Sequence, residues 1–297
     1  TGAHGIAYLR PDWARFQVFR HDPLDATSPA TGRRSGLARC PDDSLWMLVR
    51  TDSELTRVSP VGEVARWTGS HHAAVLARRR PSGIWCDGDG VLWLPDREGV
   101  LRFDPRHDTL AEGLHPGEPW AAGVAEALAR SRDGRLWVGA LTAGLNVLSP
   151  DGRNTVWRAG EHGVDNDDFE QISADPEGRI WIADATGLRH LDAAGDRFVA
   201  VETLRRERVH AFVFLDAETL LAHQLGRLSL LRRESGAWTT AWALGEGDGL
   251  PLAEASTLVI VDDQVLLTNP RGLWRIAVAA KRIVPVGRAD GLPDVQF

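Results

Sequence analysis

The sequence predicts an all-β fold, a seven-bladed β-propeller built from four-stranded blades. The first observation is a glycine-led apolar pattern that returns about every 44 residues, the period of a propeller blade. The second is that the segments within each repeat are short, alternate between apolar and polar residues, and are rich in Val, Ile, Trp and Phe. The third is the Gly, Pro, Asp and Asn content of the stretches between them. The seven copies are centred on Ile6, Leu55, Val100, Leu145, Leu188, Leu228 and Leu273.

Each complete repeat predicts four strands, which we call a to d. In residues 163–202 these are "FEQISA", "RIWIAD", "LRHLD" and "RFVAVE", in that order. Acidic-glycine pairs precede strand b at residues 89–90, 133–134 and 177–178, and their glycine supplies the positive φ of a tight turn. Two-helix repeats of similar length would instead show a period of 3.6 residues.

An aromatic position recurs near the start of strand b. It is held by Trp46, Trp93, Trp137 and Trp181, and then by Leu221 and Leu266. Because a large ring fills the widening gap between neighbouring sheets, we interpret these tryptophans as packing residues. A sugar-stacking platform formed by one or two of them is the alternative.

The repeats divide the chain into blade units of one domain, residues 1–297. The boundaries fall at about 1–35, 36–70, 71–117, 118–163, 164–207, 208–250 and 251–297. The first unit lacks a strand b signal, while the tail "DGLPDVQF" at 290–297 repeats the blade opening "DGLPLAEAS" at 248–256. We therefore expect both chain ends to complete the first blade, since ring closure removes exposed strand edges.

Composition excludes several classes of protein. A net charge of -7 over 297 residues provides no basic field for a phosphate backbone, so nucleic-acid binding is not expected. No apolar run approaches the ~18 residues that cross a bilayer, and the N-terminus has no signal pattern, so we expect no membrane insertion by this chain. The chain begins at Thr1 rather than Met, and we expect a processed product or a segment of a longer protein.

The two cysteines, Cys40 and Cys86, form no disulfide framework, and a single bridge in an oxidising compartment is the alternative to free thiols. They occupy similar places in adjacent blades, near the end of strand a. Since blades splay outward, we expect equivalent positions to lie beyond the ~7 Å Cα separation that a disulfide permits. The sequence therefore predicts two free thiols.

Motifs for catalysis or cofactor binding are not found. The histidines, including the adjacent His71 and His72 and the more distant His210 and His223, lack the short spacings of a zinc site. The acidic stretch "DNDDFEQ" at 165–171 lacks the glycine and glutamate of a calcium loop. There is no Gly-x-Ser-x-Gly elbow, P-loop or dinucleotide fingerprint. We predict no metal, no cofactor and no catalytic residue in this chain.

The stretches "DGRLWVGALTAGLNVLSP" and "EGRIWIADATGLRHLD", with the inter-blade "DGLP", resemble the two-component regulator propeller family. The resemblance covers nearly the whole chain and is strongest over residues 83–192. It implies the extracytoplasmic sensor region of a bacterial membrane receptor whose output is a histidine kinase or diguanylate cyclase. A periplasmic location and contacts with neighbouring domains of the same receptor are implied by this resemblance alone.

We therefore predict a periplasmic sensor domain that binds a small polar ligand or a protein and relays the event to a membrane-linked output. A non-catalytic protein–protein interaction scaffold is the first alternative. The second is a metal-dependent propeller lyase resembling the streptogramin-inactivating family. That chemistry needs a histidine base and a carboxylate cluster on the last blades, yet residues 251–297 contain no histidine.

The predicted binding face is formed by the loops that join strands b and c and by the inter-blade loops. The first set supplies Arg50, Asp96, Asp184, Gln224 and Asn269, and the second set supplies His72, Trp120, Asp168 and His210. A ring of charged and amide groups would orient a small polar ligand in a preformed pocket. The alternative is that these are ordinary solvated loop residues. On the binding hypothesis, replacing Asp96 and Asp184 together should abolish signalling and leave the melting temperature nearly unchanged.

Overall fold

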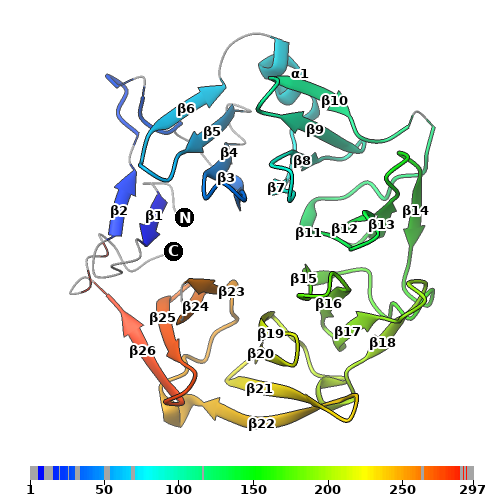
Figure 1. The fold of residues 1–297 in the computed structure, drawn as a ribbon, viewed down its shortest axis with the longest axis vertical. Helices are drawn as coiled ribbons and strands as arrows, with labels where there is room; N and C mark the ends of the chain where they lie inside the picture. The colour runs from blue at the N-terminus through cyan, green and yellow to red at the C-terminus, as the bar shows by residue number, and fades with distance from the viewer. Residues whose placement is uncertain are drawn as a thin grey trace. The chain divides into compact units, whose positions relative to one another are not determined.

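The computed structural model describes residues 6–9, 16–19, 21–25, 27–30, 34–49, 54–67, 71–115, 117–261, 264–287, 290 and 292. The chain forms two compact units, one built mainly from residues 19–158 and the other mainly from residues 159–297. Each unit holds three four-stranded antiparallel sheets, and the fold class is an all-β propeller with six such blades (Figure 1).

Blades 1 to 3 belong to the first unit, and in each of them consecutive strands pair. Blade 1 consists of β3 (Arg34–Arg39), β4 (Leu45–Val49), β5 (Glu54–Val58) and β6 (Val64–Trp67). Blade 2 consists of β7 (Trp85–Cys86), β8 (Leu92–Pro95), β9 (Val100–Asp104) and β10 (Thr109–Glu112). Blade 3 consists of β11 (Ala125–Arg130), β12 (Leu136–Ala140), β13 (Gly144–Leu148) and β14 (Asn154–Trp157).

Blades 4 to 6 belong to the second unit. Blade 4 consists of β15 (Phe169–Ala174), β16 (Ile180–Asp184), β17 (Gly187–Leu191) and β18 (Phe198–Ala200). Blade 5 consists of β19 (Ala211–Asp216), β20 (Thr219–Gln224), β21 (Arg227–Glu234) and β22 (Ala237–Gly245). Blade 6 consists of β23 (Thr257–Val261), β24 (Gln264–Asn269), β25 (Gly272–Ala277) and β26 (Arg282–Val286). Blade 4 confirms the four strands predicted for residues 163–202.

The prediction of a seventh blade is wrong. Among the described residues the first repeat forms only a two-stranded sheet, β1 (Ile6–Leu9) with β2 (Phe16–Phe19). The tail, of which residues 293–297 lie outside the described part of the chain, adds no described strand to it. The apolar pattern at Ile6 marks one strand of a repeat, and one strand signal does not establish four hydrogen-bonded partners.

Short helical segments lie between some of the strands, and the sequence pattern does not predict their positions. The helix α1 (His71–Arg79) precedes β7, and two short 3₁₀ segments, Glu202–Leu204 and Glu246–Asp248, lie in the second unit. The stretch "HHAAVLARR" is rich in Ala, Leu and Arg, which are good helix formers. Leu76 of this helix is 1% exposed and joins the core between blades 1 and 2, so packing holds the helix in place.

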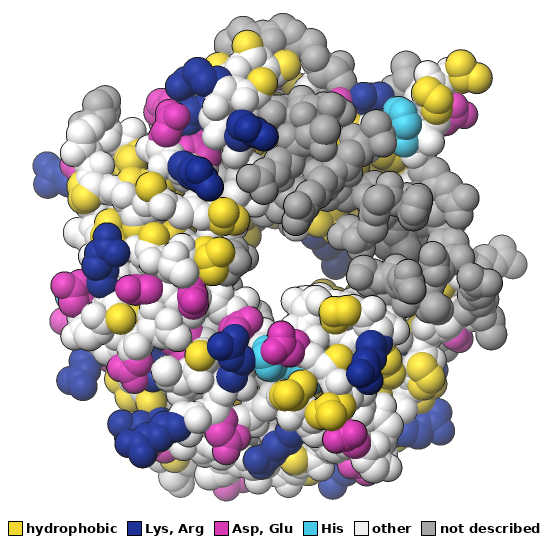
Figure 2. Space-filling view, turned by 180° about the vertical axis from the view of Figure 1, so that it is seen from behind, with side chains coloured by type: hydrophobic (Ala, Val, Ile, Leu, Met, Phe, Trp, Pro, Cys, Tyr) yellow, Lys and Arg dark blue, Asp and Glu magenta, His cyan; other side chains and the backbone are white. Residues whose placement is uncertain are grey.

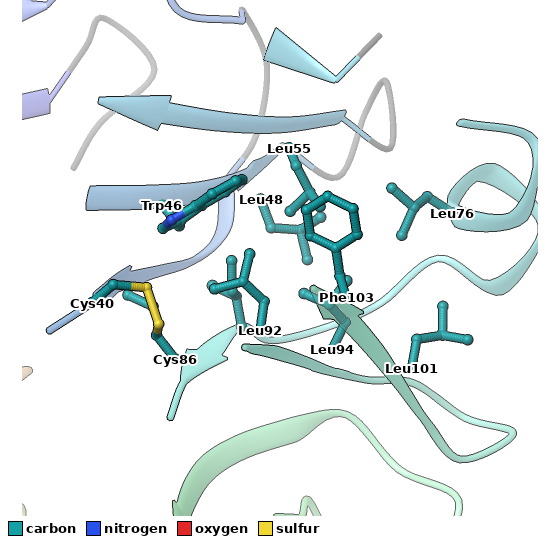
Figure 3. Close-up of a cluster of buried hydrophobic side chains, with 12 residues drawn as sticks. Cys40, Trp46, Leu48, Leu55, Leu76, Cys86, Leu92, Leu94, Leu101 and Phe103 are labelled. Carbon is teal, nitrogen blue, oxygen red and sulfur yellow. A yellow bond between two sulfur atoms is a disulfide. The ribbon is translucent and has the colours of Figure 1, made fainter. Parts of the chain in front are cut away.

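Two of the strand b tryptophans, Trp46 and Trp181, pack between neighbouring sheets. For these two, the interpretation as packing residues is confirmed. Trp46 of blade 1 lies 6.0 Å from the ring of Phe103 in blade 2, and Figure 3 shows both side chains among the leucines between these sheets. In the second unit, the ring centroids of Trp181 in blade 4 and Phe214 in blade 5 are 5.0 Å apart. Both tryptophans are 1% exposed.

The prediction that Cys40 and Cys86 are free thiols is also wrong. The two residues form a disulfide, with their Cα atoms 5.3 Å apart (Figure 3). Cys40 directly follows β3 and Cys86 ends β7, and these first strands of adjacent blades lie against each other. Outward splay separates the later strands of two blades, whereas their first strands stay within bridging distance. The disulfide therefore joins blade 1 to blade 2.

Candidate functional site

The turns that join strands b and c hold buried polar side chains. Arg50, the first residue predicted at these turns, lies outside the described residues. The exposed fraction is 1% for Asp96, 0% for Asp184, 5% for Gln224 and 1% for Asn269. A polar group withdrawn this far from water needs partners in the protein. The contacts of each residue therefore decide what it can do.

Asp96, after β8 in the first unit, is clamped by an arginine from the helix α1. Arg79 donates from Nε to Oδ2 at 2.9 Å and from Nη2 to Oδ1 at 3.0 Å. The backbone amides of Glu98 and Gly99 donate to Oδ1 and close the turn. Burial raises the pKa of the Asp96 carboxyl, while the hydrogen bonds from Arg79 and from the Glu98 amide oppose this rise. Both oxygens are thus already engaged within the protein.

The structure brings Trp120 to this turn but not His72. The indole Nε1 of Trp120 donates to the carbonyl oxygen of Asp96 at 3.0 Å. The Nε2 atom of His72 lies 2.9 Å from the carbonyl oxygen of Asp108, in the turn between β9 and β10. Successive turns of an antiparallel meander lie at opposite ends of the sheet. His72 is therefore placed at the other end of blade 2 from Asp96.

Asp184, at the end of β16 in the second unit, has a similar clamp from a different element. Arg189 of the next strand donates from Nη1 to both carboxylate oxygens of Asp184, at 3.3 and 3.1 Å. Its Nη2 donates to Asp165. The backbone amide and the hydroxyl of Thr186 donate to Oδ1 of Asp184, each at 2.6 Å. The Arg189 side chain is 3% exposed, so this ion pair is buried.

The segment 205–210 ties the b–c turn of blade 4 to strand b of blade 5. The amide of Val209 donates to the carbonyl oxygen of Asp184 at 3.1 Å, and the amide of His210 donates to that of His223 at 2.9 Å. The side-chain amide of Gln224 donates to Glu207 Oε2 at 2.5 Å. This segment therefore brings together three of the predicted residues, Asp184, His210 and Gln224. We call this segment, with His223 and Gln224, the 205–210 cluster.

Two other predicted residues of this unit are not connected to the 205–210 cluster by a described contact. Asn269 accepts the amide of Arg271 at 2.8 Å and so closes its own turn in blade 6. Asp168 is exposed, and its backbone amide donates to Asn166 at 3.0 Å. These contacts of Asn269 and Asp168, two of the residues predicted from the sequence, are therefore contacts within their own turns.

A pair of buried histidines lies at the centre of the 205–210 cluster. His223 is 0% exposed and His210 is 5% exposed, with ring centroids 5.9 Å apart. Within the described part of the chain, neither ring nitrogen of His223 has a hydrogen-bond partner. Burial, and secondarily the nearby charge of His210, lowers the pKa of His223 to about 4. His223 is therefore neutral near pH 7.

Several residues that build these turns are absent from the sequence-derived set. Arg79 and Arg189 supply the clamps, Glu207 binds Gln224, and His223 was considered only as part of a metal site. Arg189 and His223 lie within the strand patterns "GLRHL" and "TLLAHQ", where a charged or ionisable residue interrupts an apolar run. That interruption is the signal that could have identified them, because such residues are seldom fully buried without partners.

The rim of the 205–210 cluster carries charged and apolar side chains. Arg208 and Glu207 are exposed, and Arg208 donates to Glu170. Leu225 is 55% exposed and Leu252 is 46% exposed, and Gly226 lies beside the Leu252 side chain. Figure 2 shows a face of the molecule on which histidine, acidic, basic and hydrophobic side chains are exposed. Mixed polar and apolar groups of this kind suit a small polar ligand or a protein partner.

Among the described residues there is neither a metal-binding cluster of three or more ligands nor a membrane-spanning helix. No group of three or more His, Cys, Asp or Glu side chains within them is placed to hold a metal ion. No helix among them is both long enough and apolar enough to span a membrane.

Comparisons with known proteins define the class of the fold. No family model matches the sequence, and no curated protein matches it. The structure is similar to the extracellular domain of a putative hybrid two-component system from B. thetaiotaomicron, with a TM-score of 0.66 and 12% identity. That match covers 99% of this chain and 46% of the other.

Other propellers match comparably well. Virginiamycin B lyase from Staphylococcus aureus matches with a TM-score of 0.62 and 11% identity over 85% of this chain and 84% of the lyase. The WD40 repeats of RRP9 match with a TM-score of 0.62 and 12% identity over 88% of this chain and 81% of theirs. At these identities the similarities establish a propeller fold and no particular activity.

Proposed function

We propose that this chain is a non-catalytic, extracytoplasmic sensor domain that binds a small polar ligand at the 205–210 cluster. The observation that carries the proposal is the convergence of Asp184, His210 and Gln224 on one segment in the second unit. That segment exposes Glu207 and Arg208, and Leu225, which follows Gln224, is an exposed apolar residue with Leu252 close to the adjoining Gly226. Pre-positioned polar groups with an apolar rim favour recognition of a small polar molecule.

Two further observations support an extracytoplasmic location, in the periplasm if the chain comes from a bacterial receptor. The similar structure from B. thetaiotaomicron is an extracellular domain of a two-component system. The Cys40–Cys86 disulfide is a bond that persists in oxidising compartments and is rare in the cytosol. In this proposal the ligand signal passes to a histidine kinase or diguanylate cyclase linked to the membrane, and neighbouring domains of the same receptor are partners.

The test is a binding screen with matched variants. The probes are a panel of amino acids, dicarboxylates and monosaccharides, and the readouts are thermal shift and calorimetry. At least one probe should bind, and Arg208→Ala should weaken it about tenfold, since a charged contact contributes about 1.4 kcal/mol or more. Arg153→Ala is the control, because Arg153 is exposed on a c–d turn of the other unit. The proposal would be contradicted if Arg208→Ala and Arg153→Ala lost the same affinity for the probe, or if no probe bound.

The exposed Leu225 and Leu252 favour the second candidate, a protein–protein interaction scaffold. That function predicts a protein partner whose binding is weakened by Leu225→Asp and unaffected by the small probes.

A third candidate, a propeller lyase, rests on the similarity to virginiamycin B lyase. Incubation with a streptogramin B antibiotic tests it directly, since a lyase would convert the antibiotic into a product with a different chromatographic retention time.

A further inference from the structure

The backbone of blade 5 brings the side chains of His210 and His223 together. The amide of His210 donates to the carbonyl oxygen of His223 at 2.9 Å, and Ala211, the next residue, is the strand partner of His223. Two residues on one segment therefore oppose one residue of β20. This is the arrangement of a β-bulge, which re-aims a side chain relative to the regular sheet. The His210 ring accordingly lies beside the His223 ring.

The ring nitrogens of His223 are not used by the protein. His223 is 0% exposed, and neither of its nitrogens has a hydrogen-bond partner among the residues that the structure describes. Its strand partners Ala211 and Leu228 belong to the apolar core between blades 5 and 6. A buried polar atom is normally satisfied by a protein group, a water molecule or an ion. An imidazole in this position is therefore free to act as a ligand.

The separation of the two rings matches that of two imidazoles on one metal ion. Their centroids are 5.9 Å apart. A metal–nitrogen bond is about 2 Å long and a ring nitrogen lies about 1.1 Å from its centroid, so two imidazoles on opposite sides of an ion have centroids about 6 Å apart. A direct hydrogen bond between the rings would bring the centroids to about 5 Å, and His223 makes none.

The ligand set favours a monovalent ion. Within the described part of the chain, no third His, Cys, Asp or Glu side chain completes the group, whereas structural zinc is almost always four-coordinate. A divalent charge in an apolar core would also lack carboxylates to compensate it. Cu(I) and its analogue Ag(I) carry one charge, bind imidazole, and accept two ligands in a line. Since His210 is 5% exposed, the ion can enter from its side of the pair.

We propose that His210 and His223 together bind one Cu(I) ion. One nitrogen of each neutral ring donates its lone pair to the ion, and no electron or proton is transferred. The other polar groups of the 205–210 cluster, Glu207, Arg208 and Gln224, are not ligands of this ion. The inference therefore goes beyond the proposed sensor function and does not depend on it.

The experiment is a calorimetric titration of the whole chain with Ag(I), a redox-inert probe, in chloride-free nitrate buffer at pH 7. The two cysteines of the chain are joined in the Cys40–Cys86 disulfide, so no thiol competes for the probe. We expect one ion bound per chain. Cu(I), transferred without oxygen from the chelator bicinchoninate, should bind with the same stoichiometry. Zn²⁺ should bind at least about tenfold more weakly than Ag(I).

Matched variants test the two ligands. His223→Leu and His210→Leu should each weaken Ag(I) binding at least about 100-fold, since even a residue that only supports a metal ligand is worth about 10- to 100-fold. His190→Leu is the control and should leave the affinity unchanged. His190 is half-buried in blade 4, and its Nδ1 lies 3.0 Å from the carbonyl oxygen of Leu191.

A spectroscopic measurement on the native protein does not depend on whether the variants fold. The X-ray absorption spectrum of the Cu(I)-loaded chain should show two nitrogen ligands and no sulfur. Four results would overturn the inference: no binding of Ag(I) or Cu(I), a sulfur ligand in the spectrum, Zn²⁺ binding as tight as that of Ag(I), or equal losses in His190→Leu and His223→Leu.

The variant Arg208→Ala separates this inference from the sensor proposal. It should leave the affinity for Ag(I) unchanged, whereas it should weaken binding of the small polar ligand. Either proposal can therefore fail without the other.

Discussion

The gap between blades 1 and 2 and the gap between blades 5 and 6 are built on the same strand order but are closed by different chemistry. The first gap holds the buried rings of Trp46 and Phe103 among leucines and is crossed by the Cys40–Cys86 disulfide. The fully buried residues of the second are aliphatic, with Trp242 and Trp274 packed against them only partly buried; they include Leu221, Leu230, Leu258, Val265, Leu267 and Ile276. The repeat sets the pairing of strands, whereas the residue in the strand b slot, Trp46 in blade 1 and Leu221 in blade 5, differs and is fully buried in both.

This difference shows where a repeat protein can change without losing its fold. Interiors are packed to high density, so a smaller side chain in a closed core leaves a costly cavity. Leu221 stands where blade 1 has Trp46 and is 0% exposed, so neighbouring side chains have closed around the smaller residue. The two units therefore share an architecture and differ in how these gaps are filled.

The two units are alike in the b–c turns, where each has a buried aspartate that is paired with a buried arginine. Asp96→Ala and Asp184→Ala should each lower the free energy of unfolding by about 3–5 kcal/mol, because each removes the buried carboxylate from a buried arginine and leaves it only a more exposed one, Glu112 beside Arg79 and Asp165 beside Arg189. This replaces the sequence-based expectation that the melting temperature would stay nearly unchanged. Urea unfolding measures the effect, and Asp151→Ala, at an exposed ion pair with 3.7 Å separation, should cost less than about 1 kcal/mol. A small effect for one aspartate alone would show that the clamps are not equivalent.

The disulfide is the second difference that can be broken. Replacing Cys40 and Cys86 by alanine should cost about 2–4 kcal/mol, since the bridge closes a loop with a sequence separation of 46 residues. The loss should be confined to the first unit, because both cysteines belong to it. Hydrogen exchange followed by mass spectrometry would show faster exchange in β3 and β7 than in the strands of blades 5 and 6. Equal acceleration in both units would contradict this assignment.

The buried histidine pair gives the second unit a pH dependence of its own. The pKa of His223 is lowered from 6.5 to about 4, so folding favours the neutral ring. Its contribution is fully present above pH 6.5 and is lost as the pH falls from 6.5 toward 4, by about 3 kcal/mol in total. His223→Leu should remove that part of the dependence. The unfolding free energies of the native protein and of His223→Leu, each measured at pH 7 and pH 4.5, test this. If the variant loses as much stability at pH 4.5 as the native protein does, another group is responsible for the pH dependence.

The sequence was sufficient for the blade pattern because period, turn chemistry and strand alternation are local properties. The strands of residues 163–202 and the tight turns before strand b are examples, and Gly178 has the expected positive φ of 78°. The number of blades was not predictable in the same way. One apolar segment at Ile6 looks like its counterparts, yet its sheet depends on partners that the segment does not specify.

The candidate site was predictable in position but not in environment. Residues two to four positions beyond the strand b slot do reach the b–c turns, as Asp96 and Asp184 show. Their burial depends on Arg79 and Arg189, which come from a helix and from a following strand and have no fixed spacing to the aspartates. The Cys40–Cys86 bridge was missed for a similar reason, since the distance between two first strands is a tertiary property.

The smallest of these effects tests the comparison itself, by making the first gap resemble the second. Trp46→Leu should lower the free energy of unfolding by about 2 kcal/mol, less than the 3–5 kcal/mol typical of replacing a buried tryptophan by alanine. The space that the ring vacates lies between two sheets and should accept an indole from solution. Indole at about ten times its dissociation constant should then restore about 1.4 kcal/mol to the variant and nothing to the native protein. Thermal unfolding with and without indole measures this, and the native protein, in which Trp46 is 1% exposed, is the control. If indole does not stabilise Trp46→Leu, or stabilises the native protein equally, then neighbouring side chains close the first gap around a leucine as they do around Leu221 in the second.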